Sequence, residues 1–346
     1  MIDLRSDTVT QPSPAMRQAM VEAEVGDDVF GEDPSINRLQ ELGARILGKE
    51  AALYVPSGTM ANQISIKVHT QPGDEIIMER TSHPFNSESG GLAALSGVQV
   101  NLLDGQRGHL TATQVARVIR HDDNVHNAPT RLVCLENTHN RGGGSIYPLD
   151  TIRDIHDVAR AEGLGMHLDG ARLLNACVAT GTPAPAITQY FDSCTLCLSK
   201  GLGAPVGSLI AGDAAFIAKA LRYRKMFGGG MRQAGFLAAA GIYALEHHVE
   251  RLAIDHQHAK LLAERLSAAC GVALNLHEVE TNIIYLHLDP EVARYDAPGL
   301  MHAMRQRGVL ALAVGRDSMR LVLHLDISRD QVETAAQVIC ELLNGS

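Results

Sequence analysis

The sequence lacks the features of a membrane protein, a secreted protein and a nucleic-acid-binding protein. Its longest apolar stretch, AGFLAAAGIYAL, is too short to span a bilayer and fits a packed helix. The segment MIDLRSDTVTQP is charged from its third residue, so we expect no secretory signal. No run of Lys and Arg offsets the formal net charge of -9. We therefore expect a cytoplasmic protein that binds neither nucleic acid nor membrane.

The sequence also has few cysteines, and they show no disulfide framework. The six lie mostly inside apolar runs, as reduced core thiols of a cytoplasmic protein do: Cys134, Cys177, Cys194, Cys197, Cys270 and Cys340. Cys194 and Cys197 have the spacing of half a metal or redox site, but they fall in an expected strand. Residues three apart on a strand point to opposite faces, so the two sulfurs should not converge.

Histidines gather on one expected helix without forming a metal site. They are His247, His248, His256 and His258. A zinc-binding helix needs two histidines four residues apart with a supporting glutamate, and this cluster has no such arrangement. We interpret the four as a solvated face and expect no metal ligands.

The remaining composition is that of a globular protein with one large or two ordinary domains. Hydrophobic residues make up 45% and charged residues 20% of the 346 positions. From Ala51 onward, short apolar runs alternate with amphipathic stretches, which favours an α/β fold with a mainly parallel sheet. One long helix is expected over Phe236 to Ala269, and an α+β unit follows it. We predict an N-terminal arm (1–20), a large domain (21–248) and a small C-terminal domain (249–346).

Two of the expected strands end at residues that can bind a cofactor. GLGMHLDGARLL has its apolar run end at Asp169, and CLSKGLGAPVG ends the next run at Lys200. Parallel strands place such ends at one edge of a sheet, where ligands bind. A lysine amine opposite a buried acid suits pyridoxal phosphate (PLP), because the lysine can form a Schiff base while the acid holds the pyridine nitrogen protonated. The alternative is a helix-capping Asp and a solvated Lys.

Glycine-rich segments offer a place for the phosphate. In VPSGTMANQ, Ser57, Gly58 and Thr59 would open a helix with free backbone N–H groups. A plain capped helix start is the alternative. In FGGGMRQAG, Arg232 follows three glycines and could add a positive charge, or it could be a solvated arginine of a surface loop.

Three further residues are candidates for chemistry or substrate binding. His83, in the loop TSHPFNSESGG, could stack on a cofactor ring or transfer protons, and His126 raises the same question. Arg320, in MRLVLHLD, could bind a substrate carboxylate with two hydrogen bonds or could form a surface ion pair.

Taken together, these motifs resemble the low-specificity L-threonine aldolases, PLP enzymes of fold type I. The resemblance covers nearly the whole chain, in order: IDLRSDTVTQP, VGDDVFGEDP, GKEAALYVPSGTMAN, LENTHN, HLDGARLLNA, CLSKGLGAPVGSL, KMFGGGMRQAG and RLVLHLD. It implies a large domain with a seven-stranded, mainly parallel sheet and a smaller C-terminal α+β domain. It also implies a homotetramer with active sites at a dimer interface.

The resemblance implies a role for each candidate residue. Lys200 would bind PLP, Asp169 would pair with its ring nitrogen and His83 would stack on the ring. Ser57, Gly58 and Thr59 would hold the phosphate, with Arg232 nearby. The substrate carboxylate would be held by Ser6, Arg172 and Arg320, although Arg172 could instead contact a cofactor oxygen. The implied reaction is cleavage of L-threonine or L-allo-threonine to glycine and acetaldehyde. His83, His126 or a bound water could be the base.

Overall fold

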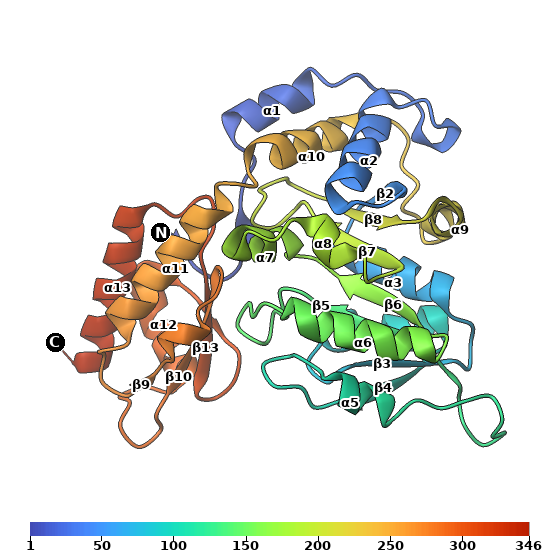
Figure 1. Ribbon diagram of the computed structural model, residues 1–346. Helices are drawn as coiled ribbons and strands as arrows, with labels where there is room; N and C mark the ends of the chain where they lie inside the picture. Colours follow the sequence, from blue (N-terminus) through green and yellow to red (C-terminus); the bar gives the residue numbers. More distant parts are fainter. Residues whose placement is uncertain (346) are drawn as a thin grey trace.

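Seven strands form the central sheet of the computed structural model, which describes residues 1–345 (Figure 1). In spatial order they are β2 (Ala51–Val55), β8 (Ser208–Gly212), β7 (Ser193–Cys197), β6 (Gly165–Asp169), β5 (Thr130–Glu136), β3 (Glu75–Glu79) and β4 (Gln99–Leu103). Strand β8 alone runs opposite to the other six, antiparallel to both β2 and β7. The predicted mainly parallel, seven-stranded sheet is therefore confirmed.

Both faces of this sheet are apolar, because alternate residues of each strand enter different cores. In β3, Ile77 packs into one core while Ile76 and Met78 pack into another, and in β5 Val133 and Leu132 divide in the same way. This explains the nearly continuous apolar runs in the sequence. One face is covered by α3 (Gly58–His69) and α9 (Ala214–Met226). The other face is covered by α2 (Pro34–Leu47), α5 (Ala112–Ala116), α6 (Leu149–Ala161), α7 (Leu173–Thr180) and α8 (Ala184–Thr188).

A second core lies in the C-terminal part of the chain. Its antiparallel sheet has the order β12 (Leu312–Ala313), β13 (Ser318–Val322), β10 (Ile283–Leu288) and β9 (Val272–Ala273). The helices around it are α11 (Leu252–Leu266), α12 (Ala297–Gln306) and α13 (Arg329–Asn344). The small α+β unit is thus present as predicted.

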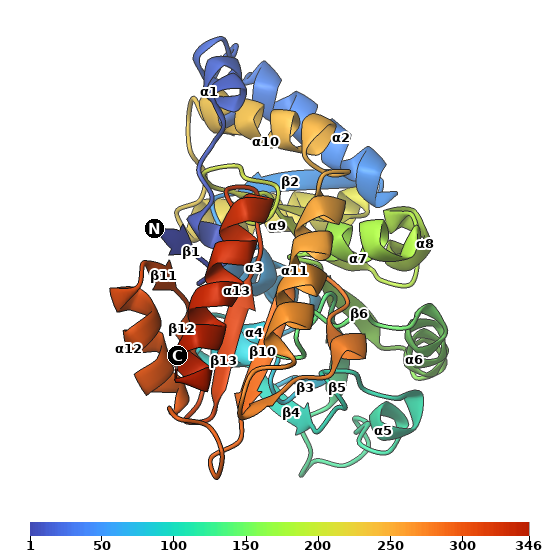
Figure 2. The ribbon, with the colours of Figure 1, turned by 90° about the vertical axis from the view of Figure 1, so that its left-hand side faces the viewer.

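The N-terminal arm belongs to this second core, although it comes first in the chain. Strand β1 (Ile2–Asp3) pairs in parallel with β11 (Val309–Leu310), and Ile2 and Leu4 are buried there. Figure 2 shows the N-terminus beside α13 and β11. The arm then crosses to α1 (Pro14–Val21), which packs against α10 (Gly235–His247). The arm therefore joins the two cores.

The prediction of one helix from Phe236 to Ala269 was wrong. The structure has two helices, α10 and α11, which are separated at His248–Arg251. The buried His248 ring lies 2.7 Å from the Leu202 carbonyl oxygen, to which its Nδ1 hydrogen-bonds. His256 is buried too, with Nε2 3.2 Å from the Asn175 side-chain nitrogen, so these two histidines are not part of a solvated face. The break reads His-Val-Glu-Arg, without a glycine or proline to mark the end of a helix, which is why the pattern did not reveal it.

The two cores meet along α11, since Leu252 belongs to the first and Ala259 to the second. The domain boundaries at 20/21 and 248/249 stay predictions. Among the described residues, no helix has the length and apolar character needed to cross a bilayer. All six cysteines are free, and Cys194 and Cys197 lie on opposite faces of β7 as predicted: Cys194 in the first core and Cys197 beside Gly58 of α3.

Candidate active site

Three neighbouring strands end in buried carboxylates at the same edge of the central sheet. These are Glu79 on β3, Glu136 on β5 and Asp169 on β6, and Glu136 and Asp169 lie directly opposite each other in register. Lys200 follows the next strand, β7. Because the four strands run parallel, their ends share one edge. The sheet thus places the predicted acid and amine on the same side.

Asp169 is held as a carboxylate by N–H donors and nearby cations. Asn62 donates to its Oδ2 at 2.8 Å, and the Ala171 backbone N–H donates to its Oδ1 at 3.1 Å. Burial alone would raise the pKa of Asp169, but the positive charges of His83 and Lys200 hold it below its ordinary value. A carboxylate of this kind can keep a facing pyridine nitrogen protonated.

His83 lies beside Asp169 through a shared partner, Glu88. The His83 Nδ1 is 2.9 Å from Glu88 Oε1, and this hydrogen bond raises the pKa of His83. Asn62 donates to the same Glu88 oxygen at 2.9 Å and so bridges Glu88 and Asp169. Glu88 therefore holds the His83 ring in place through Nδ1, which leaves Nε2 as the ring nitrogen that could contact a ligand.

His83, Glu88 and Asp169 have the composition of a metal site, with one atom of each lying within 4.8 Å of the others. The Asn62 amide, however, already places its N–H donors between the two carboxylates. Gln63 donates to the other Glu88 oxygen at 2.7 Å. The carboxylates of Glu88 and Asp169 therefore already have hydrogen-bond donors within the chain.

Lys200 lies in the turn that follows β7. Its carbonyl accepts hydrogen bonds from the Gly203 N–H at 2.8 Å and from Thr10 Oγ1 at 3.2 Å, which ties the turn to the arm. With Arg172 and Cys197, it lines a small pocket. Its charge lowers the pKa of both Asp7 and Asp169, so the amine lies near both carboxylates.

The exposed N-terminus of α3 lies next to this turn. Ser57 caps the helix by accepting from the Met60 N–H at 3.1 Å, and Ser57 and Thr59 face solvent. A Cβ on Gly58 would come within 2.7 Å of Cys197 Sγ, so only glycine lets the helix start pack this closely against β7. The predicted phosphate cradle therefore adjoins the Lys200 strand.

Arg172 forms a buried ion pair with the N-terminal arm. Its Nε and Nη2 donate to the two Asp7 oxygens at 2.6 Å each, and Asn282 of the second core donates to Asp7 Oδ2 at 3.2 Å. Ser6 caps the same turn by accepting from the Thr8 N–H. Two of the Arg172 nitrogens are thus already bonded within the chain.

Arg320 reaches the same part of the arm from β13. Its Nη2 donates to the Arg5 carbonyl at 3.2 Å and its Nη1 donates to Asn140 Oδ1 at 3.1 Å, while the buried Nε has no partner. Arg320 also lines a cavity of about 580 Å³, together with Asn140, Arg141 and Tyr285. The three residues expected to hold a substrate carboxylate, Ser6, Arg172 and Arg320, therefore converge around residues 5–7.

Two predicted site residues do not join this group within one chain. His126 is exposed in the loop before β5, at the opposite edge of the sheet from Asp169. Arg232 is 58% exposed and pairs with Asp27 at 2.8 Å. For His126, the pattern indicated a polar loop but carried no information on which edge of the sheet that loop lies.

Sequence reasoning missed the residues that hold the group together. Asn62, Glu88 and Asp7 were not singled out, and neither were Glu136 and Asn140. All five lie within segments quoted above: LRSDTVT, SGTMAN, TSHPFNSESGG and LENTHN. Most of their partners, such as Asp169 for Asn62 and Arg172 for Asp7, are far away in the sequence, so the pattern did not mark them.

The residues present fit PLP. An amine, an ionised acid held by two N–H donors, an imidazole and a helix N-terminus adjoin one another, and two arginines converge nearby. The fold and this group define an enzyme of fold type I. Comparisons with known proteins agree with this class and show to which family within it the chain belongs.

A family model described as Beta-eliminating lyase matches residues 3–289. The low specificity L-threonine aldolase of Escherichia coli (strain K12) is 46% identical over 97% of each chain. The probable low-specificity L-threonine aldolase 2 of Arabidopsis thaliana is 44% identical, over 96% of this chain and 94% of that protein. A solved threonine aldolase of Leishmania major has the same fold, with a TM-score of 0.84 at 20% identity over 99% of this chain and 100% of that one. The chain belongs to the low-specificity L-threonine aldolase family, among the beta-eliminating lyases.

Replacing Asp7 with Asn should destabilise the fold, because the buried Arg172 loses its counter-charge. We expect a loss of about 3–5 kcal/mol in the free energy of unfolding at pH 7. Burial alone would raise the pKa of Asp7, but Arg172 lowers it from 3.8 to about 2. The stabilisation is therefore complete above pH ~4 and is lost as the pH falls toward 2. Urea unfolding at pH 7 and pH 3 measures both effects.

The control is Asp3→Asn, which removes an exposed ion pair with Arg5 on the same arm. Its effect should stay below about 1 kcal/mol at either pH. Two results would contradict a buried Asp7–Arg172 pair. One is an equal loss of unfolding free energy in Asp7→Asn and Asp3→Asn. The other is a difference between wild type and Asp7→Asn that is as large at pH 3 as at pH 7.

Proposed function

We propose that this chain is a PLP-dependent carbon–carbon lyase that cleaves β-hydroxy-α-amino acids. L-Threonine and L-allo-threonine would give glycine and acetaldehyde. The observation that carries the proposal is the convergence of Lys200, Asp169 and His83 at one sheet edge, with Arg172 and Arg320 nearby. Membership of the aldolase family supports the same reaction.

The chain's own residues would bind the cofactor at this edge. Lys200 would hold it through its amine, and the N–H groups of Ser57 to Thr59 would hold its phosphate at the positive end of α3. Asp169, kept ionised, would hold the ring nitrogen protonated, and His83 would lie against the ring. When bound, PLP supplies the electron sink that Cα–Cβ cleavage needs.

Arg320 would orient the substrate by its carboxylate, with Ser6 and Arg172 close by. Fixing the carboxylate decides which bond at Cα stands perpendicular to the cofactor ring. A base takes the proton of the β-hydroxyl, the Cα–Cβ bond breaks, and acetaldehyde leaves. A proton returned to Cα completes glycine. The base is His83, a bound water, or His126 of a second copy, since His126 of the same chain lies at the other sheet edge.

We also propose that the enzyme is a cytoplasmic homotetramer in threonine and glycine metabolism. Six free cysteines fit a reducing compartment. Large apolar side chains are exposed near the glycine loop: Phe30 by 73%, Met226 by 63% and Phe236 by 45%. A Cβ on Gly229 of this loop would meet Met60 of α3, so this surface borders the phosphate cradle. A second copy covering it would adjoin the active site.

Other fold type I reactions are the nearest alternative. An aminotransferase would turn threonine into a keto acid, and a β-eliminating lyase would release ammonia. A protein that binds PLP without catalysis would make neither product. Purified protein given L-threonine and L-allo-threonine should release acetaldehyde and glycine in equal amounts, and keto acid without acetaldehyde would overturn the proposal.

Replacing Lys200 with Ala should abolish the yellow absorption of bound PLP and the release of acetaldehyde, because no other amine lines this pocket among the described residues. Absorption spectroscopy of the purified variant measures the first effect. Lys219→Ala, an exposed lysine on α9, is the control and should keep both colour and activity. Retention of colour in Lys200→Ala would show that the cofactor is held elsewhere.

Replacing Arg320 with Ala should raise the KM for L-threonine. Losing a buried contact to a carboxylate costs about 2–5 kcal/mol, which corresponds to roughly 30-fold or more in KM. Steady-state kinetics with acetaldehyde detection measures it. Arg316→Ala, four residues away and exposed, should leave KM unchanged. An unchanged KM in Arg320→Ala would remove Arg320 from substrate binding.

Replacing His83 and His126 separately with Asn should identify the base. General base catalysis is typically worth about 10²–10⁴-fold, so loss of the base should lower kcat by that factor. Glu88 raises the pKa of His83. If His83 is the base, the rate should therefore begin to fall at a higher pH on the acidic side of the pH–rate profile than it would for an ordinary histidine. Near-wild-type kcat in both variants would assign the proton transfer to a bound water.

A further inference from the structure

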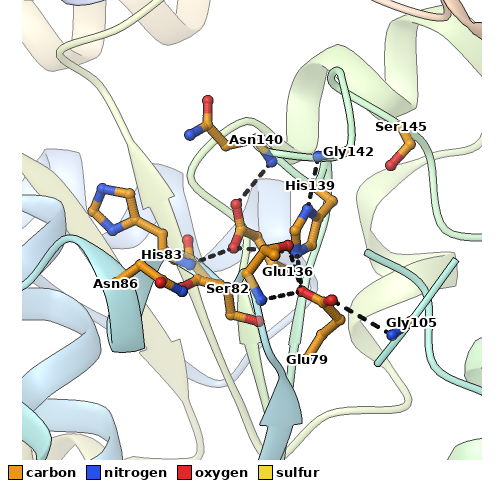
Figure 3. A network of polar contacts seen from close by, with 12 residues as sticks. Glu79, Ser82, His83, Asn86, Gly105, Glu136, His139, Asn140, Gly142 and Ser145 are labelled. Atoms are coloured by element: carbon orange, nitrogen blue, oxygen red, sulfur yellow. Dashed lines mark hydrogen bonds and ion pairs between the residues drawn. The ribbon is translucent and has the colours of Figure 1, made fainter. Parts of the chain in front are cut away.

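The buried carboxylate of Glu136 joins two parts of the site that are far apart in the sequence. Its Oε2 accepts the backbone N–H of His83 at 2.8 Å, and its Oε1 accepts the backbone N–H of Asn140 at 2.9 Å. Figure 3 shows Glu136 between these two residues. Each oxygen therefore fixes the start of a different loop.

The two loops carry different functions of the proposed enzyme. The first begins at His83, the residue expected against the cofactor ring. The second presents Asn140, whose Oδ1 accepts Arg320 Nη1 at 3.1 Å. Asn140 is the one side chain that binds the guanidinium of Arg320 among the residues described, since the other acceptor is the Arg5 carbonyl. Glu136 is thus connected to Arg320 through Asn140, which is hydrogen-bonded to both.

A second buried group supports the loop that carries Asn140. The His139 ring accepts the Gly142 N–H on Nδ1 at 3.0 Å, so its proton lies on Nε2. That Nε2 faces Glu79 Oε2 at 3.3 Å and Glu136 Oε2 at 3.8 Å. A Cβ on Gly108 would lie 2.2–2.4 Å from the His139 ring, so the ring packs directly against the Gly108 backbone. The 139–145 loop is therefore held at both His139 and Glu136.

We infer that Glu136 is a positioning residue that sets the substrate-carboxylate arginine, Arg320, relative to the cofactor-facing His83. A carboxylate can accept both N–H groups, whereas an amide of the same shape has one oxygen and one NH₂. In Glu136→Gln, one backbone N–H must face a donor, so either the His83 loop or the Asn140 loop shifts. The inference rests on the proposed function, because it concerns the same substrate site.

Glycine is the probe, since it has the substrate's amine and carboxylate but no Cα–Cβ bond to cleave. Calorimetry on the holoenzyme would give its dissociation constant. A hydrogen bond to a charged group is worth about 1.5–3 kcal/mol, so we expect Glu136→Gln and Asn140→Ala each to weaken glycine binding about tenfold or more. PLP affinity of the apoenzyme, measured by absorbance, reports separately on the His83 loop.

The double variant Glu136→Gln/Asn140→Ala separates positioning from general damage. If Glu136 acts through Asn140, the dissociation constant of the double variant for glycine should be no larger than that of whichever single variant binds glycine less tightly. Additive losses, or unchanged glycine binding in Glu136→Gln, would overturn the inference.

Glu75→Gln is the matched control. Glu75 is a buried glutamate at the other end of β3, where it accepts from Thr130 and Gln99. It should lose stability while keeping its affinity for glycine. An equal loss of glycine affinity in Glu75→Gln would show that the effect at Glu136 is general destabilisation. If the wild-type holoenzyme binds no glycine and releases no acetaldehyde, the proposed function itself fails, which is a distinct result.

Discussion

A buried carboxylate is stable only when N–H groups or cations satisfy it, and this requirement organises the active edge of the sheet. Glu79, Glu136 and Asp169 end three adjacent strands, and each accepts an N–H from the loop that follows its own strand. The loops cannot move without leaving a buried charge unpaired. The positions of His83, Asn140 and Arg172 therefore follow from the sheet.

The N-terminal arm completes the site from outside the central sheet. Its first residues lie in the second core, Asp7 binds Arg172 of the first, and Asn282 of the second core donates to the same carboxylate. One buried ion pair thus fixes the arm, the large sheet and the small sheet relative to one another. The residues proposed to bind the substrate carboxylate converge there because they come from all three parts.

Much of the fold could be predicted, because local patterns encode it. The apolar runs predicted a mainly parallel sheet, and the family resemblance predicted its seven strands. Asp169 and Lys200 were predicted to lie together because parallel strands end at one edge. The helix start at Ser57 follows from its capping side chain. The break between α10 and α11 was missed because it contains no glycine or proline, and the residue at the end of α10, His248, takes its partner Leu202 from a distant part of the chain. His126 was grouped with the site because a loop histidine carries no sign of which edge of the sheet it lies on.

By itself, the sequence determined the class of fold and the family, and it predicted a cofactor site at Asp169 and Lys200, because these depend on strand order and on residues within short motifs. Only the tertiary structure decided how the site is held. Asn62 between Glu88 and Asp169, Asp7 on Arg172, and Glu136 between His83 and Asn140 are contacts between distant segments. The physical reason is that a buried polar group takes its partner from whatever the fold brings near, and sequence spacing does not encode that proximity.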